Sequence, residues 1–214
     1  MMKIPIRVDT EFKEATLEFV TKRDFGFLKQ WRASIAKDSH PVRCDSVDFA
    51  ALACKRFTSH SPTENYAHRV DDIAIHIRNN PLSEVANLIL VKCDWFKESN
   101  VIGVAHFRRS WCNNIILDYL AAHPWSAARP VDYPIMVSGI GIAMLCFLSR
   151  LADKFGCDAI WGEATQNSCE IYKSFFQLDS VNDLLYIERK KSAAFADAIE
   201  KKWLDRKLKW TFEI

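Results

Sequence analysis

The stretch NIILDYLAAHPWSAARPVDYPIMVSGIGIAMLCFLSRLADKFG, residues 114–156, determines how the rest of the chain is organised. Its apolar run at 115–122 is typical of a buried strand. A glycine pair, Gly139 and Gly141, precedes a second apolar run at 142–155, which is long enough to predict a helix. The stretch therefore predicts a strand that leads, through a connection, to the N-terminus of a long helix.

The glycine pair is a candidate anion-binding turn. The first N–H groups of a helix have no acceptor inside the helix, and the helix dipole adds partial positive charge there. Glycines keep side chains away, so that a phosphate can approach the backbone. An alternative is that the two glycines only let the helix pack closely on a sheet. We expect a diphosphate to lie on the backbone of six residues: Ser138, Gly139, Ile140, Gly141, Ile142 and Ala143.

Two further strands and a short helix follow Gly156, the predicted C-terminal stop of the long helix. Apolar runs at 157–165 and 183–189 predict the strands, and residues 167–176 between them predict the helix. This order of elements resembles the acetyl-CoA-binding half of the GNAT family of N-acetyltransferases. Residues 138–145 are similar to the pyrophosphate loop of that family, and the start of the short helix is similar to its Asn-to-Tyr motif.

The departures from the family pattern bear on the phosphate contacts more than on the fold. Met136 stands where the family usually has Arg or Gln, and the connection from Pro124 to Gly139 is longer than usual. Phe176 stands near the place of the usual Gly. Arg129, in the long connection, is a candidate to reach a phosphate instead, although a solvated loop charge explains it as well.

The resemblance implies an α/β fold with a GNAT-like mixed, mostly antiparallel central sheet and helices on both faces. We expect a single domain over residues 1–214. Within it, residues 15–110 form the N-terminal half with the helices that shape the acceptor pocket. Residues 114–189 form the acetyl-CoA-binding half, and residues 190–214 form a C-terminal helix and strand.

Local patterns predict the elements on either side of this unit. In the N-terminal half, alternation and apolar faces predict a strand at 15–20, helices at 25–35, 46–57 and 66–77, and a hairpin of 85–91 with 101–108. Ser46 is the expected cap of the second helix. In the tail, residues 192–207 predict a helix with one apolar face formed by Phe195, Ile199, Trp203 and Leu204. Residues 208–214 alternate, and we expect them to pair antiparallel with residues 184–189.

The resemblance also implies the chemistry: transfer of an acetyl group from acetyl-CoA, as cosubstrate, to an amine in a ternary complex. The strand before the glycines would bind the pantetheine arm through the backbone of Leu120, Ala121 and Ala122. Tyr172 is the candidate acid, because a phenol is protonated at neutral pH and can donate a proton to the departing sulfur. Asn167 would bond the pantetheine, or cap its helix together with Glu170.

The sequence offers several candidates for the general base and does not choose among them. Asp118 and Glu163 lie on strands that border the expected cleft, and burial would raise the pKa of either carboxyl toward a useful value. Each carboxylate is equally explained as a partner in a structural ion pair. His106 and His123 are alternatives, as is a base that acts through water. A Cys169 acyl-enzyme is conceivable, since the thiol stands at a helix N-terminus.

Composition bears on the kinds of partner, compartment and metal site that can be expected. A net charge of +2 gives no reason to expect a nucleic-acid or membrane-surface binder. The seven scattered cysteines include no Cys-x-x-Cys pair, which favours reduced thiols in a cytoplasmic protein, and no cluster has metal-ligand spacing. The acceptor amine is not readable from the sequence, and the C-terminal segment leaves a homodimer possible. A non-catalytic acyl-CoA-binding or protein-interaction module is the alternative function.

Overall fold

The computed structural model describes residues 2–20, 22–35, 40–59 and 67–212. In this part of the chain the strands form one eight-stranded sheet in the order β6-β1-β2-β3-β4-β5-β7-β8. The strands are β1 (Met2–Val8), β2 (Glu11–Phe19), β3 (Val85–Lys92), β4 (Val101–Arg109), β5 (Ile115–Ala122), β6 (Val137–Ser138), β7 (Ala159–Glu163) and β8 (Leu184–Glu188). The helices are η1 (Lys22–Gly26), α1 (Phe27–Ser34), α2 (Pro41–Ser59), α3 (Val70–Asn79), α4 (Pro124–Ala127), α5 (Ile140–Lys154), α6 (Cys169–Phe176) and α7 (Arg189–Asp205).

The sheet is mixed and mostly antiparallel, as the sequence predicts. Every neighbouring pair of strands is antiparallel except β5 and β7, which run parallel. Parallel neighbours need a crossover connection, and here α5 supplies it between β5 and β7. The expected arrangement around the glycine-led helix is therefore confirmed.

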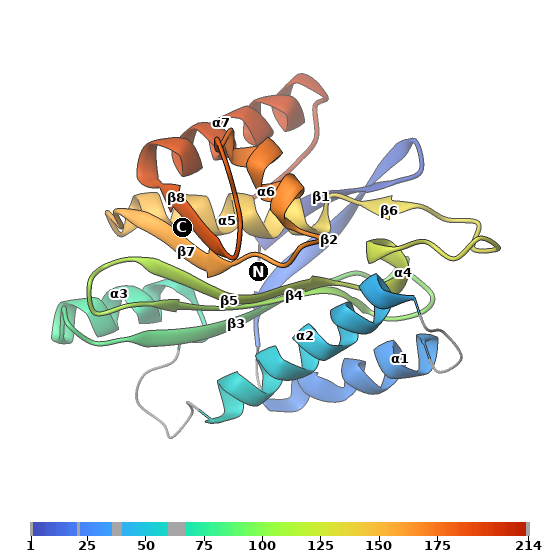
Figure 1. Ribbon diagram of the computed structural model, residues 1–214, viewed down its shortest axis with the longest axis horizontal. Helices are drawn as coiled ribbons and strands as arrows, with labels where there is room; N and C mark the ends of the chain where they lie inside the picture. Colours follow the sequence, from blue (N-terminus) through green and yellow to red (C-terminus); the bar gives the residue numbers. More distant parts are fainter. Residues whose placement is uncertain (1, 21, 36–39, 60–66, 213–214) are drawn as a thin grey trace.

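Helices cover both faces of the sheet, with α1 and α2 on one face and α5, α6 and α7 on the other (Figure 1). The alternation of β3 separates two cores, because successive side chains of a strand point to opposite faces. Ile89 and Val91 pack in the cluster that contains α5. Leu88 and Leu90 pack in the cluster that contains α1 and α2.

Both ends of α5 are set by glycines. Gly139 precedes the helix in a left-handed conformation with φ of 91°, so the helix begins at Ile140, two residues earlier than predicted. At the other end Gly156 has a φ of 63°, and the N–H of Cys157 donates to the Ala152 carbonyl at 2.8 Å. This is a Schellman cap, which confirms the predicted stop.

Two N-terminal features differ from the predictions, and one predicted feature falls outside the described residues. The strand β1 was not predicted; it pairs along its whole length with β2. The helix α2 begins at Pro41, not after a cap at Ser46, and the Ser46 hydroxyl donates to the Val42 carbonyl inside the helix. Proline suits a first helical position because it has no N–H to leave unpaired. Tyr66, the expected start of the third helix, lies outside the described residues.

The prediction for the C-terminal strand is wrong. Of the described strands, β7 alone pairs with β8, and Thr211 forms a bridge with Lys3 of β1 instead. The reason is the position of α7, which begins directly after β8 and lies along α5, where it buries Phe195 and Trp203. This helix carries the tail away from β8 to β1, near the opposite edge of the sheet. Leu204, expected on the buried face, is 65% exposed. Residues 213–214 lie outside the described residues.

No helix in the described part of the chain is both long and apolar enough to cross a membrane.

Candidate active site

A gap opens in the sheet between the two parallel strands. Pairing of β5 with β7 covers only Ile115–Leu117 against Ile160–Gly162, whereas β5 continues to Ala122 beside β4. At the last pair, a Cβ on Gly162 would come within 3.0 Å of the Leu117 carbonyl oxygen, so glycine permits this close approach. Beyond it, alternate N–H and C=O groups of residues 118–122 point toward the open side.

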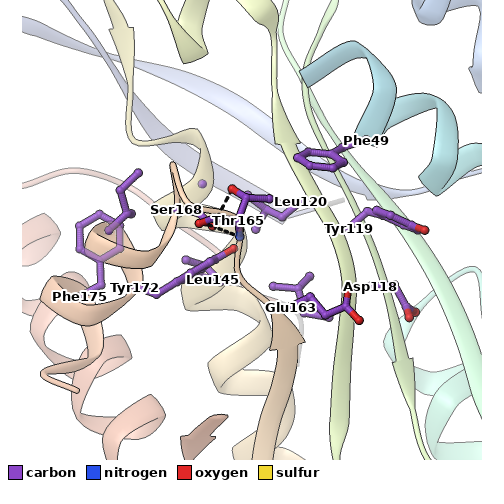
Figure 2. Close-up of a pocket in the computed structure, with 13 residues that line it drawn as sticks. Phe49, Asp118, Tyr119, Leu120, Leu145, Glu163, Thr165, Ser168, Tyr172 and Phe175 are labelled. Atoms are coloured by element: carbon purple, nitrogen blue, oxygen red, sulfur yellow. Dashed lines mark hydrogen bonds between the residues drawn. The ribbon is translucent and has the colours of Figure 1, made fainter. Parts of the chain in front are cut away.

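A cavity of about 240 Å³ lies at this gap, on the face of the sheet covered by α5 and α6. We name it the α5-side cavity. Phe49 of α2, the end of β5, the first turn of α5 and the helix α6 line it (Figure 2). It brings together five of the residues that the sequence singles out: Asp118, Leu120, Gly141, Glu163 and Tyr172. Ala121, next to Leu120, is turned the other way and packs in the α2 core.

The glycine turn lies directly against the open edge of β5. A Cβ on Gly141 would lie 3.6 Å from Leu120 Cδ2, which is an ordinary contact distance. The Ala143 N–H donates to the Gly139 carbonyl at 2.9 Å, as the first bond of the helix. Helix geometry therefore leaves the N–H groups of Ile140, Gly141 and Ile142 without an acceptor in α5. The backbone needed for an anion site is present at the predicted place.

Cations from distant parts of the chain gather beside this turn. A second cavity of about 320 Å³ is lined by Ser138 and Gly139 together with Arg7, Lys202 and Arg206. No local sequence pattern links these three cations to the turn, because β1 and the C-terminal end of α7 bring them from the two ends of the chain. Arg129, which the sequence offers either as a phosphate contact or as a solvated loop charge, is exposed in the connection after α4.

Tyr172 occupies the wall of the α5-side cavity and is 7% exposed. Burial raises the pKa of Tyr172 to about 12, so the phenol stays protonated at neutral pH. The turn before α6 is held by Ser168, whose hydroxyl accepts from the Thr165 N–H at 2.9 Å and donates to the Thr165 carbonyl at 3.1 Å. This turn fixes where Tyr172 stands.

The predicted capping box of Asn167 and Glu170 is wrong. The residue before the helix is Ser168, and the Asn167 amide instead lies 3.4 Å from the Asp45 carboxylate of α2. The Thr165–Ser168 turn moves the helix start one residue further along the chain. Cys169 donates its thiol proton to the Asn182 carbonyl at 3.2 Å, which is a structural contact and not that of an activated nucleophile.

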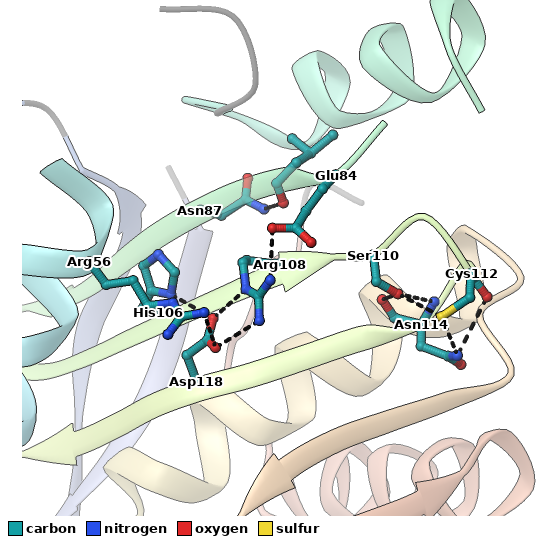
Figure 3. A network of polar contacts seen from close by, with 10 residues as sticks. Arg56, Glu84, Asn87, His106, Arg108, Ser110, Cys112, Asn114 and Asp118 are labelled. Carbon is teal, nitrogen blue, oxygen red and sulfur yellow. Dashed lines mark hydrogen bonds and ion pairs between the residues drawn. The ribbon is translucent and has the colours of Figure 1, made fainter. Parts of the chain in front are cut away.

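Asp118 is a tightly held carboxylate, contrary to the expectation of a base with a raised pKa. It accepts hydrogen bonds from Arg108 at 2.8 and 3.0 Å and from His106 Nδ1 at 3.0 Å, and Arg56 lies 3.4 Å away (Figure 3). Burial by itself would raise the pKa of Asp118, but these donors outweigh it and the pKa is lowered. A carboxylate that stays ionised and occupied in this way is an anchor for the two arginines.

A β-bulge places Asp118 in that position. Tyr119 pairs with His106 and Leu117 pairs with Phe107, so Asp118 is the extra residue of β5. A bulge turns its side chain and strengthens the local twist. Because Asp118 is an acceptor only, His106 donates from Nδ1, and burial lowers the pKa of this imidazole. His106 is thus a neutral structural donor.

Glu163 is the carboxylate that remains at the gap. It ends β7 and lines the α5-side cavity, but it is exposed, so the expectation that it is buried is wrong. Within the described part of the chain, no cation or hydrogen-bond donor holds its carboxylate. Figure 2 shows it directed toward the gap beside β5. Its position and its availability distinguish it from Asp118.

His123 is a structural residue. Its Nδ1 accepts from the Trp125 N–H at 3.2 Å and caps α4. Trp31 and Phe96 surround the ring, with centroids 5.4 and 4.8 Å away. Burial in this aromatic site lowers the pKa of His123 to about 3, which keeps the imidazole neutral.

No family model and no curated protein matches the chain. Among solved structures, a provisionally assigned acetyltransferase from Exiguobacterium sp. 255-15 shares 14% identity with a TM-score of 0.46, covering 85% of this chain and 98% of its own. An acetyltransferase of the GNAT family from Staphylococcus aureus Mu50 shares 12% identity with a TM-score of 0.41, covering 82% and 99%. A tandem GNAT protein from the clavulanic acid biosynthesis pathway shares 18% identity with a TM-score of 0.38, covering 87% and 43%.

Proposed function

We propose that this protein is an acyltransferase that moves an acetyl group from acetyl-CoA to an amine. The observation that carries the proposal is the meeting of three features at one gap: the unpaired edge of β5, the N-terminus of α5, and a protonated tyrosine that lines the same cavity as an available carboxylate. Leu120, Gly141, Glu163 and Tyr172 line one cavity there. Acyl transfer needs a held thioester, an amine that loses a proton and a thiolate that gains one.

The residues present suit acetyl-CoA as the acetyl donor. The backbone of residues 120–122 can bond an extended pantetheine arm as an added strand would, since β7 does not pair with them. The N–H groups at Ile140–Ile142 and the helix dipole suit the diphosphate. Lys202 of α7 and Arg206, which directly follows this helix, supply positive charge beside the same turn.

Two ionisable side chains, Glu163 and Tyr172, carry the proton transfers of the proposed reaction. Glu163 takes a proton from the acceptor's ammonium group, directly or through water, and leaves a neutral amine. The amine nitrogen attacks the thioester carbonyl, a C–N bond forms and the C–S bond breaks. Tyr172 gives its proton to the departing sulfur and regains one from the nitrogen. Overall, an ammonium ion and a thioester become an amide, a thiol and one proton.

A non-catalytic acyl-CoA-binding module is the second candidate. One observation favours it: Asp118, a carboxylate that the sequence offered as a base, is committed to Arg108 and His106. Such a module would keep the glycine turn and the open strand without needing Glu163.

Release of CoA thiol from acetyl-CoA, measured with and without a panel of primary amines, tests the proposal. We expect release that depends on the amine and an acetylated product of matching mass. Acetyl-CoA binding without amine-dependent release for any class of amine would favour the binding module.

A further inference from the structure

A third cavity, of about 320 Å³, opens on the opposite face of the sheet from the α5-side cavity. We name it the α2-side cavity. Both cavities include Asp118, Tyr119 and Glu163 in their walls, so they meet at the gap between β5 and β7. A donor that enters past α5 and an acceptor that enters past α2 would approach each other at Glu163.

The outer wall of the α2-side cavity is apolar and uncovered. Ile160 and Leu185 face the α5 core, so Trp161 and Leu184 point to the other face. There they are 42% and 63% exposed, because α2 packs on β3, β4 and β5 and leaves β7 and β8 bare. Large apolar side chains at the edge of a cavity offer a contact surface for an apolar group.

The charges in this cavity are of both signs and lie on opposite walls. Arg56 of α2, with 35% of its side chain exposed, lines one wall, and the exposed Glu163 lines the other. Arg108 and Asp118 lie between them and are only 13% and 8% exposed. Asp118 pairs with Arg108 at 2.8 Å and also lies 3.4 Å from Arg56, while Arg108 pairs with Glu84 at 2.7 Å. A ligand that enters this cavity therefore meets one accessible guanidinium and one accessible carboxylate.

We propose that the acceptor is an α-amino acid with an apolar side chain. Arg56 binds its carboxylate, Glu163 faces its amine, and Trp161 with Leu184 supports its side chain. This charge pattern fits a zwitterion and disfavours polyamines, whose further cations would meet Arg56. The inference rests on the proposed acetyl transfer and specifies its substrate class.

Three acceptors that differ only in the carboxyl position test the inference: L-phenylalanine, L-phenylalaninamide and phenethylamine. We expect kcat/KM for phenylalanine to exceed that for each of the other two by at least about 10-fold, as loss of one charge-assisted bond predicts. The amine of the amide is less basic and more often neutral, so intrinsic reactivity alone would give the opposite order for that pair.

Arg56→Gln should reduce the ratio of phenylalanine to phenethylamine by about 10-fold or more, and Arg56→Lys should retain part of it. Lys55→Gln is the matched control, because it removes the same charge from the neighbouring exposed position of α2 outside the cavity. If Arg56→Gln fails to fold, Trp161→Ala in its place should lower the preference for phenylalanine over glycine.

The outcomes separate the two proposals. Equal or faster acetylation of the amide and of phenethylamine by the unaltered protein would overturn the amino-acid inference and leave acetyl transfer standing. An unchanged ratio in a folded Arg56→Gln protein would also overturn it. A protein that neither binds acetyl-CoA nor acetylates any amine would overturn both.

Discussion

Asp118 and Glu163 stand at the same gap, and their surroundings give them different roles. Asp118 neutralises buried arginine charge, whereas Glu163 is exposed at the end of β7. Removing one partner of a buried ion pair leaves an uncompensated charge, which typically costs about 3–5 kcal/mol. The sequence showed two acidic residues on strands, and only their tertiary partners distinguish the held carboxylate of Asp118 from the available carboxylate of Glu163.

Asp118→Asn should therefore lower the free energy of unfolding by about 3 kcal/mol, measured by urea denaturation. Glu163→Gln should change that free energy by less than about 0.5 kcal/mol and lower kcat by about 100-fold or more. Equal stability losses in the two variants, or full turnover in Glu163→Gln, would contradict these roles.

Tyr172 should act on the leaving thiolate and not on binding. Tyr172→Phe keeps the ring that packs in the α5-side cavity and removes the proton, so kcat should fall about 100-fold while the Kd for acetyl-CoA changes little. Tyr133→Phe serves as the control, because Tyr133 packs on Trp125 in the connection after β5. Unchanged turnover in Tyr172→Phe would reject its role as the acid.

His123 makes the stability depend on pH. The unfolded imidazole takes up a proton below about 6.5, whereas the folded one stays neutral down to about 3. The unfolded state then binds more protons, so stability is full above pH 6.5 and is lost as the pH falls toward 3.

In urea titrations from pH 7.5 to 4.5, His123→Asn should reduce the slope of unfolding free energy against pH by about 1.4 kcal/mol per pH unit below 6.5. Asn keeps an acceptor for the Trp125 N–H but does not titrate. A slope unchanged by His123→Asn would show that this histidine is protonated in the folded state.

At the scale of the element, α5 and its glycines connect the core to the site. Gly139 has a φ of 91°, a conformation that costs residues with a side chain about 1–2 kcal/mol. A Cβ there would have nothing within 4 Å, so only backbone strain opposes it. Gly26, at φ of −57° and equally open, is a control with no such strain.

Gly139→Ala should thus lower the thermal midpoint, with a loss of about 1–2 kcal/mol at the midpoint, whereas Gly26→Ala should be neutral or slightly stabilising. Equal midpoints for the two variants would mean that α5 can begin without its left-handed residue.

Local signals explain which elements the sequence predicts. The strand β5 has the predicted bounds, and the stop of α5 follows from Gly156, since both depend on residues close together in the chain. The strand β1 was missed although its apolar residues alternate with Lys3, Pro5 and Arg7 as in a half-buried strand. Pro5 argues locally against a strand, and pairing with β2 and β6 determines it. The tail was misplaced because its partner depends on where α7 packs.

At the scale of the whole molecule, the sheet brings together residues that no local pattern links. The sequence located the glycine turn, Tyr172 and Glu163, each on an element with a clear signal. Four cations reach the two cavities only through the arrangement of the layers. They are Arg56 of α2, Arg7 of β1, Lys202 of α7 and Arg206 directly after α7. The two-sided gap between β5 and β7 is likewise a property of the assembled sheet.

Calorimetric titration with acetyl-CoA tests the central claim most directly, using the unaltered protein, Gly141→Ala and Gly141→Asp. The alanine Cβ meets Leu120 at an ordinary 3.6 Å, whereas the aspartate adds negative charge where the diphosphate is expected. We expect micromolar binding by the first two proteins and at least a ten-fold loss in the third. No binding by the folded unaltered protein, or equal affinity in Gly141→Asp, would contradict the account.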